Sequence, residues 1–359
     1  MDNVKITFGM IVLNGEPFVR YNLRSIYPFA HEIIVVEGAC PAASNVARSD
    51  GHSRDGTLER LRQFLEFEDP ECKMQIVTAE IEGHANGFWP EKDEMSQAYA
   101  NRATGNYLWQ VDSDEFYKTE DINSVIKMLT ENPSISEISF RTITFWGGLN
   151  FKVDGILLRL GDQDFHRLFS WKKGYKYLTH RPPTVVNEQG VNLLNQNSIP
   201  AKKLAKIGIF LYHYEYLFPI QVYNKANYYA NAPHCKGLRP SRIWVDDCYM
   251  NLSKPFRVHN IHRWLSWLEP YSGTHPPIVV NMLSDVEAKK FVEITIRGEL
   301  DIEKLAISRL YRIKIIMLKI SIPFIKMYFN FRSILRNFAI KLGLWSHIKS
   351  IKQKFYSMD

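Results

Sequence analysis

The sequence predicts an α/β fold with a Rossmann-like, mostly parallel sheet and helices on both faces. Residues 5–13 and 32–36 are apolar enough for buried strands, and residues 18–26 between them carry apolar side chains at helical spacing. Strand, helix and strand within about thirty residues form a βαβ unit, which requires parallel strands. A third observation is a further apolar strand, residues 107–111, that ends directly in a run of acidic residues.

The other elements follow from the same periodicities. The turn-forming residues 14–17 end the first strand. Several strands late in the chain are rich in aromatic residues, which favours antiparallel pairing there. The expected helices are residues 57–65, 89–103 and 121–129, and the expected further strands are residues 74–77, 135–145, 167–171 and 174–177.

The acidic run Asp112-Ser113-Asp114-Glu115 is the strongest functional signal. Side chains alternate along a strand, so Asp112 and Asp114 are expected to point the same way. Two carboxylates at the end of a strand repel each other unless a cation lies between them. The oxygen ligands favour Mg²⁺ or Mn²⁺. An acidic turn or helix N-cap is the simpler interpretation of such a run, but the buried strand before it favours the metal site.

Polar side chains also follow the other strands of the βαβ unit. Asn14 follows the first strand and Glu37 the second. Ligands of parallel α/β sheets bind beyond the carboxyl ends of the strands, where Asp112 and Asp114 are also expected. Lys92, Asn101 and Arg102, on the helix before the acidic strand, are candidates to contact a diphosphate.

Composition excludes several classes of protein. The net charge of +7 belongs to the end of the chain, because residues 304–358 contain twelve Lys or Arg and no acid. The rest is slightly acidic, so nucleic acid is not an expected partner. The four cysteines have no paired spacing, which argues against a disulfide framework and fits a reducing compartment. No secretory leader is expected at the N-terminus.

The final fifty residues are expected to form two basic amphipathic helices, residues 305–319 and 324–342, separated by Pro323. No apolar run there is long enough to span a bilayer. Residues 304–356 are therefore expected to lie on an anionic membrane surface, with a helix packed on the rest of the protein as the alternative. The expected location is cytoplasmic, peripheral on the inner face of the membrane.

These motifs resemble those of the family 2 glycosyltransferases, which have a GT-A fold. Residues 8–16 resemble the opening strand and turn of that family, and residues 32–37 resemble its E-I-I-V-V-D segment. Residues 53–57 are similar to S-T-D-G-T, and residues 105–115 to G-x-Y-x-L-x-x-D-x-D-E. Residues 166–169 resemble the R-L-F strand of the lipopolysaccharide and capsule-type members.

The resemblance implies transfer of a sugar from a nucleoside-diphosphate sugar, with inversion, to a saccharide or lipid-linked acceptor. It implies that Asn14 and Glu37 contact the nucleotide and that Asp112 approaches the ribose and the metal ion. Asp114 would bind the metal directly. A late histidine completes the metal shell in this fold; His213 is the first candidate and His180 the second.

The same resemblance suggests a domain organisation. Residues 1–245 would form the catalytic domain, divided into a nucleotide-sugar half, 1–116, and an acceptor half, 117–245. Residues 246–303 would be an aromatic and helical extension, and residues 304–359 the basic amphipathic tail.

Inverting transfer also needs a base for the acceptor hydroxyl. The family's usual His-Glu pair is His180-Arg181 here, so the acid is absent at that position. Glu188, in a loop of the acceptor half, is the expected base. Glu215 and the Asp246-Asp247 pair are the rivals.

Two alternative functions remain open from the sequence. A sugar nucleotidyltransferase would need a Gly-rich, Arg-containing loop after the first strand, which residues 14–17 do not supply. A catalytically inactive membrane-associated adaptor would have kept the fold but lost the activity. The intact Asp112-Ser113-Asp114 run argues against the adaptor.

Overall fold

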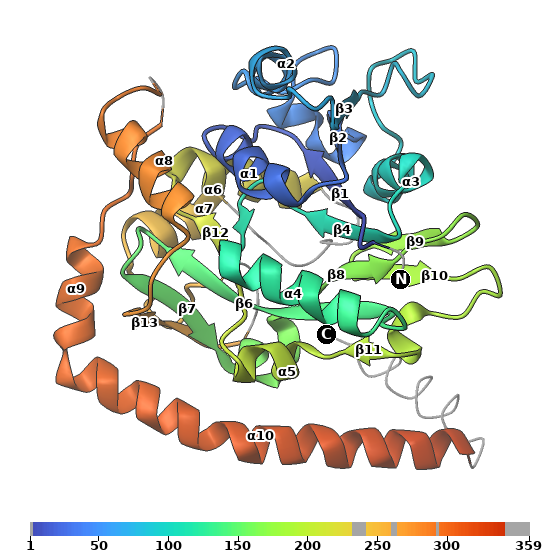
Figure 1. The fold of residues 1–359 in the computed structure, drawn as a ribbon. Coiled ribbons are helices and arrows are strands. Elements are labelled where there is room, and N and C mark those ends of the chain that lie inside the picture. The colour runs from blue at the N-terminus through green and yellow to red at the C-terminus, as the bar shows by residue number, and fades with distance from the viewer. Residues whose placement is uncertain (1–2, 232–241, 260–263, 292–293, 342–359) are drawn as a thin grey trace, which may run out of the picture.

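The structure is a computed structural model that describes residues 3–231, 242–259, 264–291 and 294–341 (Figure 1). Four parallel strands form the first half of its central sheet, in the order β3-β2-β1-β4. The predicted βαβ unit is therefore confirmed. The elements of this half are β1 (Ile6–Val12), α1 (Phe18–Ile26), β2 (Glu32–Glu37), α2 (Thr57–Phe67), β3 (Met74–Val77), α3 (Lys92–Arg102) and β4 (Tyr107–Val111).

Helices cover both faces of this parallel half, because side chains of a strand alternate between faces. Phe8 and Met10 of β1 belong to the hydrophobic cluster that contains residues of α1 and α2. Gly9 lies on the opposite face, where it meets the ring of Tyr99 from α3. The predicted α/β class with helices on both faces is thus confirmed.

The second half of the sheet adds antiparallel strands, as the aromatic-rich segments suggested. The strand β8 pairs antiparallel with both β4 and β6, and β7 and β13 extend the sheet beyond β6. The remaining strands are β5 (Glu115–Phe116), β6 (Glu137–Trp146), β7 (Phe151–Gly155), β8 (Asp164–Ser170), β9 (Lys176–His180), β10 (Pro183–Val186), β11 (Ser198–Ile199), β12 (Leu211–Tyr216) and β13 (Ser266–Pro270). The remaining helices are α4 (Thr119–Glu131), α5 (Ala201–Lys206), α6 (Pro219–Asn231), α7 (Arg242–Trp244), α8 (Pro277–Glu287), α9 (Leu300–Ile307) and α10 (Arg309–Lys341).

A β-bulge interrupts the pairing of β8 with β6. Ile138 pairs with Leu168, but the next residue, Ser139, pairs with His166, so Arg167 has no residue opposite it. A bulge changes the direction of side chains along the strand. Here it lies next to the carboxyl end of β4.

The segment 246–303 packs closely on the residues before it. Its strand β13 pairs antiparallel with β7, and its Tyr249 packs against Trp146 of β6 with ring centroids 5.1 Å apart. Ile302 joins the same hydrophobic cluster. The boundary predicted at residue 245 therefore falls within one packed cluster, and the functional division into domains stays a prediction.

The described part of the basic tail contains the end of α9 and one long helix, α10, which runs beneath the rest of the molecule (Figure 1). The prediction that Pro323 separates two helices is wrong, because the helix continues through Pro323. A proline removes one backbone donor but leaves the other hydrogen bonds of a long helix in place. Within the described residues, no helix has an apolar stretch long enough to cross a bilayer. Residues 342–359 of the predicted tail lie outside the described residues.

Candidate active site at the carboxyl edge of the sheet

A cavity of about 820 Å³ opens at the carboxyl ends of the parallel strands. Its wall combines the loops after β1, β2 and β4 with side chains from β8, β12 and α6. The polar and charged side chains that line it include Asn14, Glu16, Lys92, Asp112, Asp114, Asp164, His166, Arg167, His180, Arg181, His213, Glu215, Gln221, Lys225 and His259. This is the position at which open α/β sheets bind their ligands.

The side chain of a buried asparagine forms hydrogen bonds with the backbone of the acidic turn after β4. The Nδ2 of Asn22, on α1, donates to the backbone carbonyl oxygens of Asp112 at 3.2 Å and Glu115 at 2.6 Å. The backbone N–H of Tyr214 donates to the carbonyl of Asp114 at 2.9 Å. These bonds fix the backbone of the turn, and both aspartates line the cavity. Strand alternation is not the reason, because β4 ends at Val111 and Ser113 lines the same cavity.

Arg167 is the cation beside the first aspartate. It is buried and donates to both carboxylate oxygens of Glu115, at 2.8 Å from Nε and 2.5 Å from Nη2, and it lies 3.5 Å from Oδ2 of Asp112. Burial alone would raise the pKa of Asp112, but Arg167 and the nearby Arg181 lower that pKa well below its usual range. Asp112 is therefore ionised.

Asp114 has a different set of neighbours. Its Oδ2 accepts a hydrogen bond from Gln221 at 3.0 Å, and its Oδ1 lies 3.6 Å from Nε2 of His213. Burial favours the neutral carboxyl, but His213 outweighs burial and lowers the pKa of Asp114. The first predicted histidine thus lies beside the second aspartate.

The side chains around Asp114 supply some, but not all, of the ligand atoms that a divalent metal ion needs. Asp114 offers a carboxylate oxygen and His213 a ring nitrogen, which Mn²⁺ accepts, and Asp112 adds a second carboxylate to the same cavity. Among the described residues, no cluster of three His, Cys, Asp or Glu side chains forms a complete ligand set. A metal ion held by these residues would need further ligands from water or a bound phosphate.

His180 lines the cavity but is bonded to α3. Its Nδ1 lies 2.9 Å from Oγ of Ser96, and its backbone N–H donates to Asp93 at 2.6 Å. Burial, with Arg181 beside it, lowers the pKa of His180 to about 3, so its ring is neutral. No carboxylate side chain within the described part of the chain forms an ion pair with it.

The two residues predicted to contact the nucleotide differ in their positions. Asn14 lines the cavity, and its side chain donates to the carbonyl of Val46 at 2.8 Å and accepts from the backbone N–H of Arg54 at 2.8 Å. Glu37 is fully buried behind the cavity wall. Its carboxylate binds Ser53, through N–H and Oγ at 2.8 Å, and Nδ1 of His52 at 2.7 Å.

Glu37 therefore anchors the loop that carries Ser53, and its carboxylate does not line the cavity. This corrects its expected position. The pattern of strand ends identified the correct edge of the sheet. The apolar strand before Glu37 could not indicate that the loop of residues 41–56 folds back over the Glu37 side chain.

Arg102 and Glu188 do not line the cavity either. Arg102 ends α3, ten residues after Lys92, which corresponds to about 15 Å along a helix. Lys92 lines the cavity, whereas Arg102 pairs with Glu82. The expectation that Arg102 contacts a diphosphate has no geometric support.

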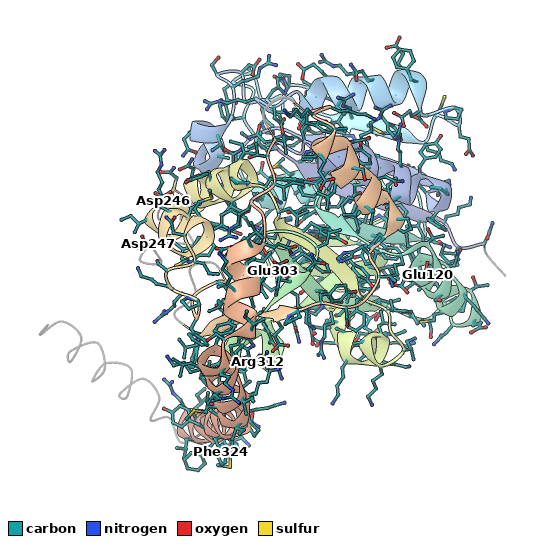
Figure 2. All side chains as sticks on the ribbon, turned by 90° about the vertical axis from the view of Figure 1, so that its left-hand side faces the viewer. Glu120, Asp246, Asp247, Glu303, Arg312 and Phe324 are labelled. Carbon is teal, nitrogen blue, oxygen red and sulfur yellow. The ribbon has the colours of Figure 1, made fainter. Side chains whose placement is uncertain are left out.

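Glu188 is exposed in the loop after β10, where its side chain lies against Gly174. Of its rivals, Asp246 accepts from the hydroxyl of Tyr223 at 2.5 Å and Asp247 pairs with Lys254 at 2.7 Å. Both lie at the outer edge of the molecule (Figure 2), and neither lines the cavity.

Glu215 lies in the cavity wall and pairs with Nζ of Lys225 at 2.5 Å. Burial would raise the pKa of Glu215, but Lys225 and His213 lower it far below its usual range. Of the expected bases, Glu215 alone lines the cavity, and its basicity is low.

Sequence reasoning named Lys92 as a contact for a diphosphate but missed the other cationic side chains of the cavity. Arg181 and Lys225 line it together with Arg167 and Lys92. The ammonium group of Lys92 lies 4.2 Å from the ring centroid of Tyr228, and Arg181 donates to the hydroxyl of Tyr229 at 2.6 Å. These basic residues occur singly in α3, β8, the β9–β10 turn and α6. The sequence around each of them does not indicate that they come together in the fold.

Glu16 was also missed. It lines the main cavity and an adjoining one of about 460 Å³. Burial raises the pKa of Glu16 to about 7, although Arg60 lies 3.3 Å from its carboxylate. The turn-forming sequence around Pro17 indicated a turn and gave no reason to expect a buried carboxyl.

Comparison with known proteins gives distant structural likenesses only. No family model matches this chain, and no curated protein matches it. The structure is similar to residues 1–349 of S. aureus TarS in complex with UDP-GlcNAc, with 12% identity and a TM-score of 0.37 over 70% of this chain and 75% of that one. Against a longer TarS structure, the chain spans only 21% of its length.

A second likeness is to glucosyl-3-phosphoglycerate synthase from Mycobacterium tuberculosis, in complex with Mn²⁺, uridine diphosphate and glucosyl-3-phosphoglycerate. It has 17% identity and a TM-score of 0.28, and it covers 40% of this chain and 45% of that one. The low TM-scores mark these similarities as distant.

Proposed function

We propose that this chain is a GT-A-type inverting glycosyltransferase. It would move a sugar from a nucleoside-diphosphate sugar to a saccharide or lipid-linked acceptor, with Mn²⁺ or Mg²⁺ bound at Asp112 and Asp114. One observation carries the proposal: two ionised aspartates and several cationic side chains share a single cavity at the carboxyl edge of a parallel sheet.

The charges of this cavity suit a diphosphate leaving group. Cleavage of the bond to the anomeric carbon develops negative charge on the departing diphosphate. Arg181 and Lys225 line the cavity and supply positive charge for phosphate oxygens. Burial lowers the pKa of Lys92 in the same wall to about 7, and a bound diphosphate would favour its charged form. A divalent ion, when bound, would neutralise part of the same charge as a Lewis acid.

The metal ligands in this proposal are Asp112, Asp114 and His213. His180 is the weaker fourth candidate, because Ser96 already lies within hydrogen-bond distance of its Nδ1. Asn14 remains a candidate for the nucleotide pocket, which the adjoining cavity beside Glu16 extends.

The test is a thermal-shift screen of UDP-GlcNAc, UDP-glucose, GDP-mannose and dTDP-glucose, with and without Mn²⁺. A ligand that binds only the folded protein raises its melting temperature by mass action. We expect one nucleotide class to stabilise the wild type in a Mn²⁺-dependent way and to be cleaved slowly to the nucleoside diphosphate. Asp114→Asn should lose the Mn²⁺-dependent part of the shift and lower the cleavage rate by at least 100-fold.

Asp164→Asn is the matched control, since Asp164 lines the same cavity but pairs with Arg141 at 2.9 Å. Binding without cleavage by the wild type would favour the inactive adaptor. Formation of a nucleotide sugar from a nucleoside triphosphate and a sugar phosphate would favour the nucleotidyltransferase. An Asp114→Asn shift equal to that of the wild type would remove the metal role.

We further propose that α10 lies on an anionic membrane surface. Its exposed apolar side chains repeat every three or four residues along the helix: Leu310, Ile313, Met317, Ile320, Phe324, Met327, Phe331 and Ile334. The helix also carries eight Lys or Arg and no acid. Two copies of such a helix would repel each other if paired, whereas anionic lipid headgroups would attract it. This favours a bilayer over a second copy of the chain.

A further inference from the structure

The bulge in β8 brings two consecutive side chains, His166 and Arg167, to the same cavity. In a regular strand, neighbouring side chains point to opposite faces. Arg167 uses this position to bind Glu115 and Asp112. In the described structure His166 forms no ion pair with Asp112 or Glu115, so its position in the cavity wall has another cause.

A buried carboxylate lies within hydrogen-bond distance of the His166 ring. Its Nδ1 lies 2.9 Å from Oε1 of Glu137, which is fully buried, and 2.8 Å from Oγ of Ser139. Ser139 also donates to the same Oε1 at 2.7 Å. A carboxylate only accepts hydrogen bonds, so Nδ1 of His166 is the donor to Glu137, and in the neutral ring Nε2 is the acceptor.

That Nε2 forms no hydrogen bond with any side chain or backbone group in the described ranges. Two carboxylates of the cavity differ from it in this respect, whereas Glu16 keeps a raised pKa of about 7 because of burial and is tested below. Asp164 pairs with Arg141, and Glu215 pairs with Lys225. A cation beside a carboxylate favours its ionised form and makes it a weaker proton acceptor.

Resting on the glycosyl transfer proposed above, we propose that His166 is the catalytic base that takes the proton of the acceptor hydroxyl. The acceptor oxygen bonds to the anomeric carbon, the bond from that carbon to the diphosphate oxygen breaks, and its electron pair leaves with the diphosphate. The hydroxyl proton moves to Nε2 of His166. Glu137 acts as a positioning residue, because its carboxylate holds the ring and stabilises the imidazolium that forms.

The experiment measures release of nucleoside diphosphate from the four nucleotide sugars named above, with Mn²⁺, where water replaces the acceptor and also loses a proton. His166→Gln should keep the melting temperature and the donor-induced thermal shift but lower the release rate by about 10²–10⁴-fold. His166→Ala should regain part of its rate when imidazole is added to the buffer. His31→Gln is the control, since His31 is exposed and bonded to Thr104 outside the cavity.

Glu137→Gln tests the positioning role. It should lower kcat with little change in the KM for the donor, whereas general loosening of the fold would also lower the melting temperature. Release at the wild-type rate by His166→Gln, or loss of imidazole rescue in His166→Ala, overturns the inference. A loss of rate in Glu16→Gln with none in His166→Gln would assign the base to Glu16 instead. If the wild type binds and cleaves none of the nucleotide sugars, the proposed function fails, and the inference fails with it.

Discussion

At the scale of single residues, Arg167 shows how the protein brings two acids together. Its guanidinium binds Glu115 and approaches Asp112, and these two residues belong to the same acidic turn. A planar guanidinium offers several donors in a fixed geometry, so one side chain can serve two carboxylates. The repulsion expected within the acidic run is therefore reduced by the chain itself, before any metal ion binds.

Asp121, in the first turn of α4, has no such partner. Its Oδ2 is buried with no hydrogen-bond partner in the described structure. Burial, with Glu120 nearby, raises the pKa of Asp121 to about 6 from 3.8. The folded state binds more protons than the unfolded state between these values, so the contribution of Asp121 to stability falls as pH rises from about 4 to about 6.

We therefore expect Asp121→Asn to raise the free energy of unfolding by about 1–2 kcal/mol at pH 7.5 and by much less at pH 4, because one pKa unit corresponds to about 1.4 kcal/mol and solvent screens part of it. Urea denaturation at both pH values measures this difference. Glu131→Gln, at the exposed end of the same helix, is the control. An equal effect at both pH values would show that charge burial is not the cause.

At the scale of elements, the close approach of α3 to β1 sets one wall of the cavity. The position of Gly9 allows this approach, because a Cβ there would lie 2.4 Å from Cδ2 of Tyr99. Tyr99 is fully buried, so its ring has little room to move. The same helix begins at Lys92, and its contact with β1 therefore helps to place that ammonium group in the cavity.

Gly9→Ala should lower the free energy of unfolding by about 1–3 kcal/mol, which is typical of overpacking in a core. Thermal unfolding measures the loss. In a Tyr99→Leu background the same substitution should cost less, because the ring that it meets is gone and neighbouring substitutions are not additive. Equal costs in both backgrounds would contradict the proposed contact.

At the scale of the whole molecule, α10 runs beneath the rest of the protein (Figure 1). Its first turns pack on the body through Tyr311 and Ile315, which cluster with Trp267 of β13. Farther along, Phe324 is 65% exposed. Figure 2 shows α10 below the other elements, with Arg312 nearer the body and Phe324 at the lower edge of the view. The proposal of membrane binding rests on this exposed apolar surface.

We expect the full chain to sediment with vesicles that contain anionic phosphatidylglycerol and to bind far less to pure phosphatidylcholine. The double substitution Met317→Asp and Phe324→Asp should weaken binding at least tenfold, because both exposed apolar side chains become acidic. Phe67→Asp is the matched control, since Phe67 is 73% exposed on α2. Self-association of the chain without vesicle binding would contradict the membrane proposal and favour a second copy.

The sequence by itself determined the parallel half of the sheet and the place of Asp112 and Asp114 at its edge. Both follow from short-range patterns: apolar runs specify buried strands, and a helix between two such strands forces them to be parallel. The local pattern also predicted α1 from residues 18–26, and the helix has these bounds.

Only the tertiary structure decided which other side chains reach the cavity. Glu37 is covered by a loop that folds back on it, and Arg102 lies at the far end of the helix that Lys92 begins. Arg167 and His166 reach the cavity through a bulge that depends on how β8 pairs with a strand more than twenty residues earlier. The register of strands that are distant in sequence is set by their packing, so no local pattern of residues reveals it.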